Sequence, residues 1–212
     1  MNSLHFLLPA AAYMIGSIPF GLLLSRGSGI DIRQHGSGNI GATNVSRLVG
    51  KKVGFLTLLL DAVKGWLPMF AAGLLLSDDS SRSLITALCG AAAVTGHMFS
   101  IFLRFKGGKG VATALGIFLY IAPKALLVSL AVFIAVTAPT GFVSLGSLLG
   151  SAAMPLSLYF FAEPLWKFWL AVFVGMMIWI KHYQNIRRLL NGTEKRFREK
   201  EKIISSQNRP LA

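Results

Sequence analysis

A glycine-rich, basic stretch at residues 106–113 has the composition of a phosphate site, in the order Lys-Gly-Gly-Lys-Gly-Val-Ala-Thr. Glycines permit a positive φ and a close approach of the backbone to a ligand, and the lysines supply positive charge. The final threonine stands at the predicted start of an apolar helix, where free N–H groups and the helix dipole favour an anion. The candidate ligands are Lys106, Gly107, Gly108, Lys109, Gly110 and Thr113. Two interpretations stay open, a phosphate site and a lysine-anchored loop beside a membrane, because the spacing does not fit a Walker A loop.

A second polar stretch, residues 36–44, reads Gly-Ser-Gly-Asn-Ile-Gly-Ala-Thr-Asn. Such a composition suits a tight turn whose N–H and hydroxyl groups face a ligand. An arginine, the side chain suited to bidentate phosphate contact, follows one helical turn later if a helix begins there. The candidates are Ser37, Asn39, Thr43, Asn44 and Arg47. An ordinary polar loop is the alternative, but long connections in small proteins are usually functional, which favours a site.

Four further polar residues lie near predicted segment ends: His97, Ser144, His182 and Asn185. A lone histidine in a helix is most often a hydrogen-bonded packing residue, but His97 lies close in sequence to the stretch 106–113, so a packing role and a role in the site both stay open. Asp61 and Lys64, three residues apart inside an apolar run, predict either a buried ion pair that holds helices together or a catalytic pair. No carboxylate accompanies the cationic motifs.

The composition is that of a membrane protein. Of the 212 residues, 54% are hydrophobic and 14% charged, with a mean hydropathy of +0.62. Ordinary soluble domains have roughly 45–50% apolar and about 25% charged residues. The net charge of +13 therefore has to concentrate in loops and in the tail, facing anionic headgroups or anionic substrates. The single cysteine excludes an intrachain disulfide, and no clustered Asp, Glu, His and Cys set indicates a metal or a cofactor.

Seven membrane spans are expected in an all-α fold, two of them short. Pro19 is expected to kink the first span or free a carbonyl, and Ala122-Pro-Lys124 interrupts an apolar run that is long for one span and short for two. Residues 181–190 are expected to prolong the last helix up to a stop at Asn191-Gly192. The expected spans are 4–24, 53–77, 83–103, 111–121, 125–138, 145–161 and 165–180.

Basic residues cluster at 26–52, 104–109 and 181–209. By the positive-inside rule all three clusters are cytoplasmic, so an even number of spans must separate them. Dividing 111–138 into two spans satisfies this condition and predicts an N-terminus outside and a C-terminus in the cytoplasm. All the polar motifs then meet at one membrane face. The expected organisation is one transmembrane domain, residues 1–198, and a basic cytoplasmic tail, residues 199–212.

Four motifs occur in order: Gly16-Ser-Ile-Pro-Phe-Gly21, the stretches 36–44 and 106–113, and His182-Tyr-Gln-Asn-Ile-Arg187. Together they resemble the bacterial acyl-phosphate:glycerol-3-phosphate acyltransferase family over nearly the whole chain. The resemblance implies an inner-membrane enzyme that transfers an acyl group from acyl phosphate to the sn-1 hydroxyl of glycerol 3-phosphate, without a cofactor. It also implies a soluble enzyme that supplies acyl phosphate as a candidate partner, and no nucleic acid. The His-x-x-x-x-Asp motif of acyl-CoA-dependent glycerolipid acyltransferases is absent.

The resemblance also implies residue roles. It places acyl phosphate at residues 107–113 with Ser37 and Asn39 nearby. It places glycerol 3-phosphate against Arg47, Lys106, Ser144, His182 and Asn185. His182, His97 and a substrate phosphate are the candidate proton acceptors, and the lack of a carboxylate beside the cationic motifs favours the phosphate. A transporter for an anionic solute and a membrane scaffold are the alternatives; polar motifs at one face rather than at mid-membrane disfavour the first.

Overall fold

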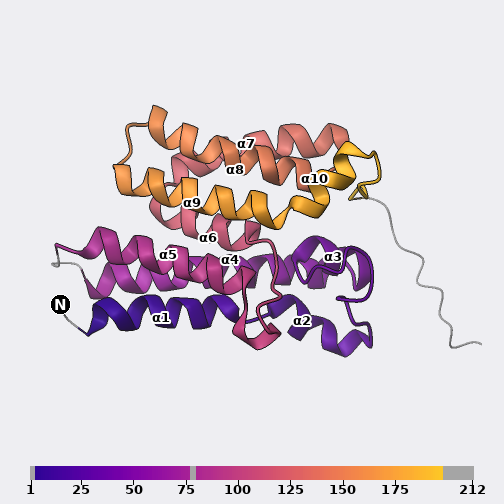
Figure 1. Cartoon of the computed structure of the whole chain (residues 1–212), viewed down its shortest axis with the longest axis horizontal. Helices are drawn as coiled ribbons and strands as arrows, with labels where there is room; N and C mark the ends of the chain where they lie inside the picture. Colours follow the sequence, from indigo (N-terminus) through magenta and orange to yellow (C-terminus); the bar gives the residue numbers. More distant parts are fainter. Residues whose placement is uncertain (1–2, 77–79, 198–212) are drawn as a thin grey trace, which may run out of the picture.

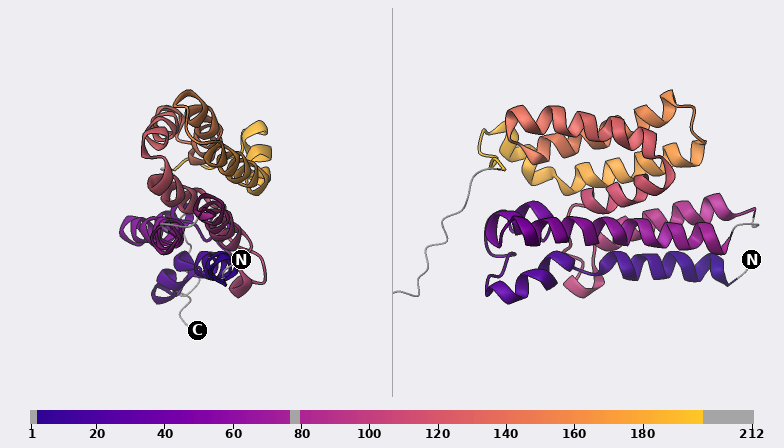
Figure 2. Two further views of the ribbon diagram at one scale, coloured as in Figure 1. Left: turned by 90° about the vertical axis from the view of Figure 1, so that its left-hand side faces the viewer. Right: turned by 180° about the vertical axis from the view of Figure 1, so that it is seen from behind.

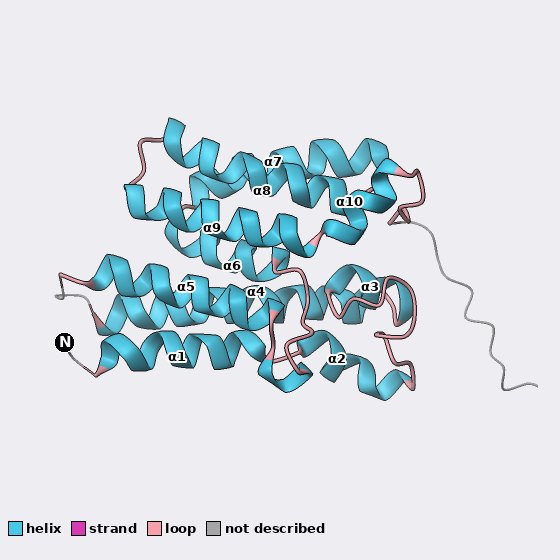
Figure 3. Ribbon diagram, in the orientation of Figure 1, coloured by secondary structure: helices cyan, strands magenta, loops and turns pink. Residues whose placement is uncertain are grey.

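The structure is a computed structural model that describes residues 3–76 and 80–197. Within these ranges the secondary structure is helical throughout, as the sequence predicts (Figure 3). The connection between the predicted spans 53–77 and 83–103 lies partly, and the predicted tail 199–212 wholly, outside the described residues. The α-helices are α1 (Leu4–Ser17), α2 (Phe20–Ser25), α3 (Ala42–Leu48), α4 (Lys51–Leu75), α5 (Arg82–Met98), α6 (Val111–Ile121), α7 (Pro123–Thr140), α8 (Val143–Phe160), α9 (Leu165–Lys181) and α10 (Tyr183–Leu190), with short 3-10 turns at Arg26–Ser28 and Ile101–Leu103.

The helices form two groups that lie side by side with their axes roughly parallel (Figures 1 and 2). The first group contains α1 to α5 and the second contains α7 to α10. Helix α6 lies between them and packs on α4, on α7 and, less extensively, on α5 and α9. The short helices α2, α3 and α10 gather at one end, which we call the polar end, and α1 begins at the other.

Five helical segments are long and apolar enough to cross a membrane: 4–28, 51–75, 82–103, 123–140 and 143–160. The pair α9 and α10 would form a sixth segment. The predicted break after Ile121 is confirmed, because α6 ends there and α7 begins at Pro123. Proline suits this first helical position, where its missing N–H costs no hydrogen bond. Helix α6 has 11 residues and therefore reaches only about 16 Å, half of a roughly 30 Å hydrocarbon core.

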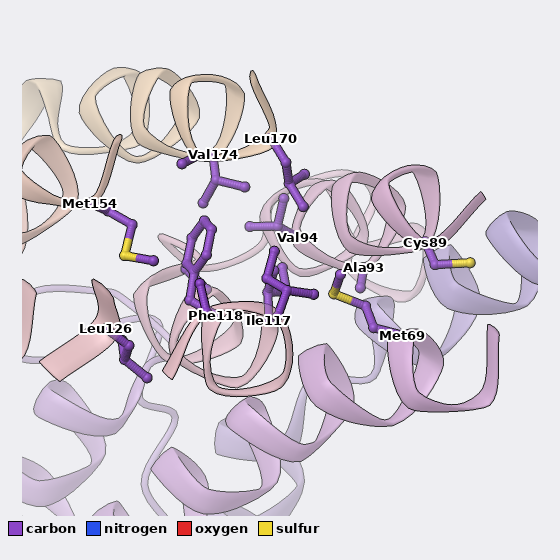
Figure 4. Packing of buried hydrophobic residues seen from close by; sticks show 14 of the residues in the cluster. Met69, Cys89, Ala93, Val94, Ile117, Phe118, Leu126, Met154, Leu170 and Val174 are labelled. Atoms are coloured by element: carbon purple, nitrogen blue, oxygen red, sulfur yellow. The ribbon is translucent and has the colours of Figure 1, made fainter. Parts of the chain in front are cut away.

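One apolar core joins the two groups (Figure 4). Ile117 and Phe118 of α6 project between Met69 and Val94 of the first group and Val174 of the second, and all five side chains are buried. Small residues bring α1 and α5 together: a Cβ on Gly16 would clash with the backbone of Ala93. This core fixes the two groups relative to each other.

The predicted effect of Pro19 is confirmed. Helix α1 ends at Ser17, α2 begins at Phe20, and the carbonyl of Ile18 is released from the helix. The Lys64 ammonium donates to that carbonyl at 2.8 Å and also pairs with Asp61 at 2.8 Å. Both charged side chains are buried, so the pair stabilises a broken helix, which is the structural role among the two interpretations.

Two local predictions are wrong. Residues 181–190 do not prolong α9, because the axis bends by 60° between α9 and α10. At this bend the carbonyl of Ile178 accepts the backbone N–H of His182 at 3.0 Å and lies 2.8 Å from Nδ1 of the same residue. The predicted span 125–138 does not end at residue 138 either: α7 continues through Pro139 to Thr140, and Gly141 ends it in a left-handed conformation with φ of 76°.

Candidate functional site

A cavity of about 780 Å³ lies between the two helix groups at the polar end. The first group, with α6, contributes Ser37, Arg47 and Lys109 to its wall, and the second contributes Ser144 and His182. The structure therefore brings together residues from four separated motifs. Of all the predicted site residues, those on this wall are Ser37, Asn39, Thr43, Asn44, Arg47, His97, Lys109, Gly110, Ser144, His182 and Asn185.

Asn44 shapes the loop that precedes α3. Its buried amide donates to the carbonyls of Ile32 and Asn39, both at 2.9 Å, and its Oδ1 accepts from the N–H of Ser37 at 2.9 Å. One side chain therefore satisfies several backbone groups that the loop would otherwise leave unpaired. The exposed Ser37 side chain is left on the cavity wall, while Asn39 uses its Oδ1 on the N–H of Gly41.

Arg47 presents an unused donor to the cavity. Its Nε is buried and has no hydrogen-bond partner among the described residues, and one terminal nitrogen donates to the carbonyl of Arg196 at 3.4 Å. A buried guanidinium nitrogen without a partner is costly unless a ligand or water satisfies it. Arg47, in the last turn of α3, is thus equipped to bind an anion in the cavity.

The first two glycines of the stretch 106–113 serve packing. The N–H of Gly107 donates to Met98 at 3.2 Å and that of Gly108 to His97 at 3.0 Å, so both satisfy carbonyls at the end of α5. A Cβ on Gly108 would collide with the His97 imidazole. The prediction of positive φ holds for Gly110 alone, at 82°. Instead, Arg104 and Phe105 take φ of 50° and 63°, which sequence pattern gave no reason to expect.

The start of α6 provides the anion-binding geometry. Lys109, Gly110, Val111 and Ala112 line the cavity, and their backbone N–H groups donate to no carbonyl within the described residues. Free N–H groups and the positive dipole end favour a phosphate here. Thr113 is fully buried against Gly65 of α4, and Lys106 is exposed; neither lies on the cavity wall.

Lys109 is the half-buried cation at this helix start. Burial, together with the neighbouring charges of Arg188 and Arg47, lowers the pKa of its ammonium to about 8, although Glu194 opposes the shift. The ammonium is thus charged at neutral pH and loses its proton readily above it.

The second group supplies a hydrogen-bonded cluster that sequence reasoning missed in part. Glu194 accepts hydrogen bonds from Ser144 Oγ at 2.6 Å, from Asn185 Nδ2 at 2.6 Å and from Arg188 Nε at 2.7 Å. Burial alone would raise the pKa of Glu194, but these three donors lower it overall. The expectation that no carboxylate accompanies the cationic motifs is therefore wrong.

The position of Glu194 follows from the helix stop predicted at Asn191-Gly192, which is confirmed. Gly192 has φ of 67°, and the N–H of Thr193 donates back to Arg188 at 2.8 Å. The chain reverses there, so that Glu194 returns to the side of α10 that carries Asn185. The Asn191-Gly192 helix stop is therefore the sequence feature from which the return of Glu194 to the site could have been predicted.

His182 stands at the junction of α9 and α10 and is buried on the cavity wall. Its Nδ1 faces a carbonyl, which only accepts hydrogen bonds, so Nδ1 carries the proton and donates. Nε2 of the neutral ring is then an acceptor. At the base of the cavity the Nδ1 of buried His97 lies 3.8 Å from Asp61 and has no hydrogen-bond partner among the described residues.

Beyond the polar end the cavity becomes apolar. Phe118, Leu126, Met154 and Val174 line its deep part and are buried. Phe55 of α4 and Ile134 of α7 also line it, and they are 67% and 60% exposed on the lateral surface. The cavity thus joins a cationic, hydrogen-bonding end to an apolar groove that reaches the lipid-facing side.

Comparison with known proteins gives a consistent result. The sequence profile of the glycerol-3-phosphate acyltransferase family matches residues 6–192. The chain belongs to the glycerol-3-phosphate acyltransferase family. It is 52% identical to the glycerol-3-phosphate acyltransferase of Desulfotalea psychrophila, over 93% of this chain and 100% of that protein. It is 50% identical to that of Trichlorobacter lovleyi, over 89% of this chain and 95% of that protein.

Two crystal structures of PlsY, an integral membrane glycerol 3-phosphate acyltransferase, share the fold of this family member. The glycerol 3-phosphate form superposes with a TM-score of 0.85 at 40% identity, covering 91% of this chain and 94% of PlsY. The lysophosphatidic acid form gives a TM-score of 0.83 at 39% identity over the same shares. The predicted family and the all-helical, integral membrane character are therefore confirmed.

Proposed function

We propose that this chain transfers a fatty acyl group from acyl phosphate to the sn-1 hydroxyl of glycerol 3-phosphate and forms lysophosphatidate and phosphate. One observation carries the proposal: a single cavity joins a cationic end to an apolar groove at the lipid-facing surface. Such a cavity suits one substrate with an acyl chain and one that is water-soluble and anionic. Its volume of about 780 Å³ lies within the usual range of ligand sites.

The apolar groove is the proposed site of the acyl chain. Burial of each methylene group contributes about 0.8 kcal/mol, so the groove supplies binding energy that a short-chain donor lacks. With the chain between Phe118, Leu126 and Met154, the carboxyl end of the donor reaches the start of α6. There the free N–H groups at residues 109–112 and the Lys109 ammonium hold the donor phosphate.

Glycerol 3-phosphate is proposed to bind at the polar end. Arg47 receives its phosphate with the unused guanidinium nitrogen, and Ser37 lies on the same wall. The cluster of Ser144, Asn185 and Glu194 faces it from the second helix group, with His182 beside it. The roles predicted for Lys106 and Thr113 remain predictions, and of the two lysines in the stretch 106–113 it is Lys109 that lies on the cavity wall.

The transfer requires no covalent enzyme intermediate, because phosphate is a good leaving group. The hydroxyl oxygen of glycerol 3-phosphate forms a bond to the acyl carbon, and the bond from that carbon to the phosphate oxygen breaks. The hydroxyl proton passes to a phosphate oxygen or to Nε2 of His182, the acceptor that its tautomer leaves free. The enzyme aligns the two substrates and stabilises the charge that develops on the acyl oxygen and on the leaving phosphate.

The same proposal places the chain in the bacterial inner membrane with seven crossings, the N-terminus outside and the polar end at the cytoplasmic face. The five long helices, the bent pair α9 and α10 and the short α6 supply the seven segments. A soluble enzyme that produces acyl phosphate is the proposed partner, because this donor is consumed at the cytoplasmic side.

Purified protein, labelled glycerol 3-phosphate and a single donor test the proposal. Acyl phosphate is expected to support lysophosphatidate formation with no other protein present, whereas acyl-CoA of the same chain length is expected to support none. Product formation from acyl-CoA alone would overturn the donor assignment.

A further inference from the structure

Lys181, the last residue of α9, makes two contacts across the boundary between the helix groups. Its ammonium donates to the carbonyl of Met98 at 3.0 Å and lies 4.7 Å from the centroid of the Phe99 ring. Met98 is the last residue of α5, where carbonyl groups have no partner within the helix. A lysine at a helix C-terminus satisfies such a carbonyl and interacts favourably with the dipole.

The carbonyl of Met98 accepts a second hydrogen bond, from the N–H of Gly107 at 3.2 Å. The same helix end therefore holds both Lys181 and the loop that leads into the start of α6. Residue 182, next in the chain after Lys181, is the histidine on the opposite wall of the cavity. A single carbonyl thus connects the wall that carries Lys109 with the wall that carries His182.

Other hydrogen bonds across this boundary at the polar end are weaker. Arg47 reaches the carbonyl of Arg196, and Lys195 reaches the carbonyl of Gly36, both at 3.4 Å and both exposed. The apolar core that joins the groups lies deeper, around α6. The hydrogen bond from half-buried Lys181 to Met98 is shorter, at 3.0 Å, than either of these two. Lys181 also directly precedes His182, which lies on the cavity wall.

We propose that Lys181 is a positioning residue that sets the spacing between the two walls of the cavity through the carbonyl of Met98. The inference rests on the proposed function. Lys181 touches neither substrate. It acts through the loop at Gly107 and through His182, the next residue in the chain. The transition state requires the two walls at the correct distance more strictly than the binding of either substrate does, so loss of Lys181 weakens catalysis more than binding.

The test compares Lys181→Met, Lys181→Arg and a matched control, Lys167→Met. Lys167 lies at the other end of α9, in a surface ion pair with Glu163 at 2.6 Å, and its removal is expected to leave turnover unchanged. Lys181→Met is expected to lower kcat about tenfold with each KM within about twofold of the parent. Lys181→Arg keeps a donor and stacks on Phe99, so it is expected to restore most of the turnover.

Three kinetic outcomes would overturn the inference. One is a full kcat in Lys181→Met, the second is an equal loss in Lys181→Arg and Lys181→Met, and the third is a raised KM for one substrate with an unchanged kcat, which would make Lys181 a direct ligand. If Lys181→Met does not fold, Phe99→Leu replaces it. Removal of the ring is expected to lower kcat about threefold, and an unchanged kcat would contradict the inference.

A spin-label distance separates this inference from the proposed function. Lys52 of α4 and Ala138 of α7 are exposed, lie in different helix groups, and can each be replaced by a labelled cysteine, while Cys89 is fully buried. Lys181→Met is expected to broaden the distance distribution, and Lys167→Met to leave it unchanged. If the parent protein transfers no acyl group, the proposed function fails, and the spin-label distance alone then tests the role of Lys181. An unchanged distance distribution in Lys181→Met would overturn the inference.

Discussion

Ser144, in the first turn of α8, donates its hydroxyl hydrogen to Glu194, fifty positions later in the chain, over 2.6 Å. Glu194 also holds Asn185 and Arg188 of α10. One carboxylate therefore orders polar side chains from two helices at the edge of the cavity. The pre-organisation of a binding site by such a shared acceptor reduces the reorganisation that binding or catalysis would otherwise require.

Glu194→Gln is expected to lower both turnover and stability. The amide keeps the size of the side chain but loses the charge that three donors satisfy, and hydrogen bonds to a charged group contribute about 1.5–3 kcal/mol each. Thermal unfolding in detergent measures the stability, and kcat at saturating glycerol 3-phosphate measures the turnover. Glu163→Gln, at the opposite end of the second helix group, is the control; an equal loss in both variants would contradict the role of Glu194.

The same carboxylate predicts a pH dependence of stability. Because the folded-state pKa of Glu194 is lowered from its ordinary value of 4.5, the ionised carboxylate stabilises the fold above that pH. The stabilisation is lost as the pH falls through the folded-state pKa. The unfolding temperature of the parent protein should therefore drop more steeply below about pH 4.5 than that of Glu194→Gln. Parallel curves would contradict this assignment.

The lowered pKa of Lys109 predicts that kcat/KM for acyl phosphate declines on the basic side of its pH profile. With its pKa near 8, the ammonium is neutralised between about pH 7 and 9, and the donor phosphate loses its cation. The kcat/KM for acyl phosphate, which reports the free enzyme, should fall over this range. Lys109→Arg stays charged and should move the decline beyond the measured range. If Lys109→Arg shows the same decline of kcat/KM at the same pH, the decline belongs to another titrating group.

Arg47→Ala is expected to raise the KM for glycerol 3-phosphate strongly. Loss of a charged contact of about 1.5–3 kcal/mol corresponds to roughly a tenfold to hundredfold weaker interaction. Arg33→Ala is the matched control, because Arg33 forms an exposed ion pair with Asp31 in the same connection. Initial rates over a range of glycerol 3-phosphate concentrations check this, and kinetics equal to those of the control would refute the assignment.

Gly108→Ala is expected to disrupt the loop before α6. The added methyl group would meet the rigid, buried imidazole of His97, and overpacking of this kind costs about 1–3 kcal/mol. Turnover and unfolding temperature should both fall. Gly27→Ala, which adds a methyl group with nothing within 4 Å, should change neither. If Gly108→Ala behaves like Gly27→Ala, the packing role of Gly108 is wrong.

Much of the fold could be predicted because its causes are local. Pro19 and Pro123 stand at the helix breaks between α1 and α2 and between α6 and α7, and apolar runs identify the helices around them. The buried Asp61 and Lys64 were recognisable as an ion pair from their spacing of one helical turn. The membrane crossings and their direction, by contrast, remain predictions from charge distribution.

The rest depends on contacts between distant segments, which spacing does not encode. Gly107 and Gly108 looked like ligand-binding glycines, but they pack against α5. Glu194 stands in a basic tail and joins the site only because Gly192 reverses the chain. The bend of 60° between α9 and α10 at His182 is likewise a feature that no periodicity predicts.

The central claim is direct transfer from acyl phosphate to glycerol 3-phosphate within one cavity. Phosphorus NMR of purified protein with acyl phosphate, before and after addition of glycerol 3-phosphate, tests it most directly. The account predicts no phosphate release by the protein before the addition, and afterwards one phosphate for each lysophosphatidate formed. A burst of phosphate equal to the enzyme concentration, with an acyl group covalently attached to the protein, would contradict it.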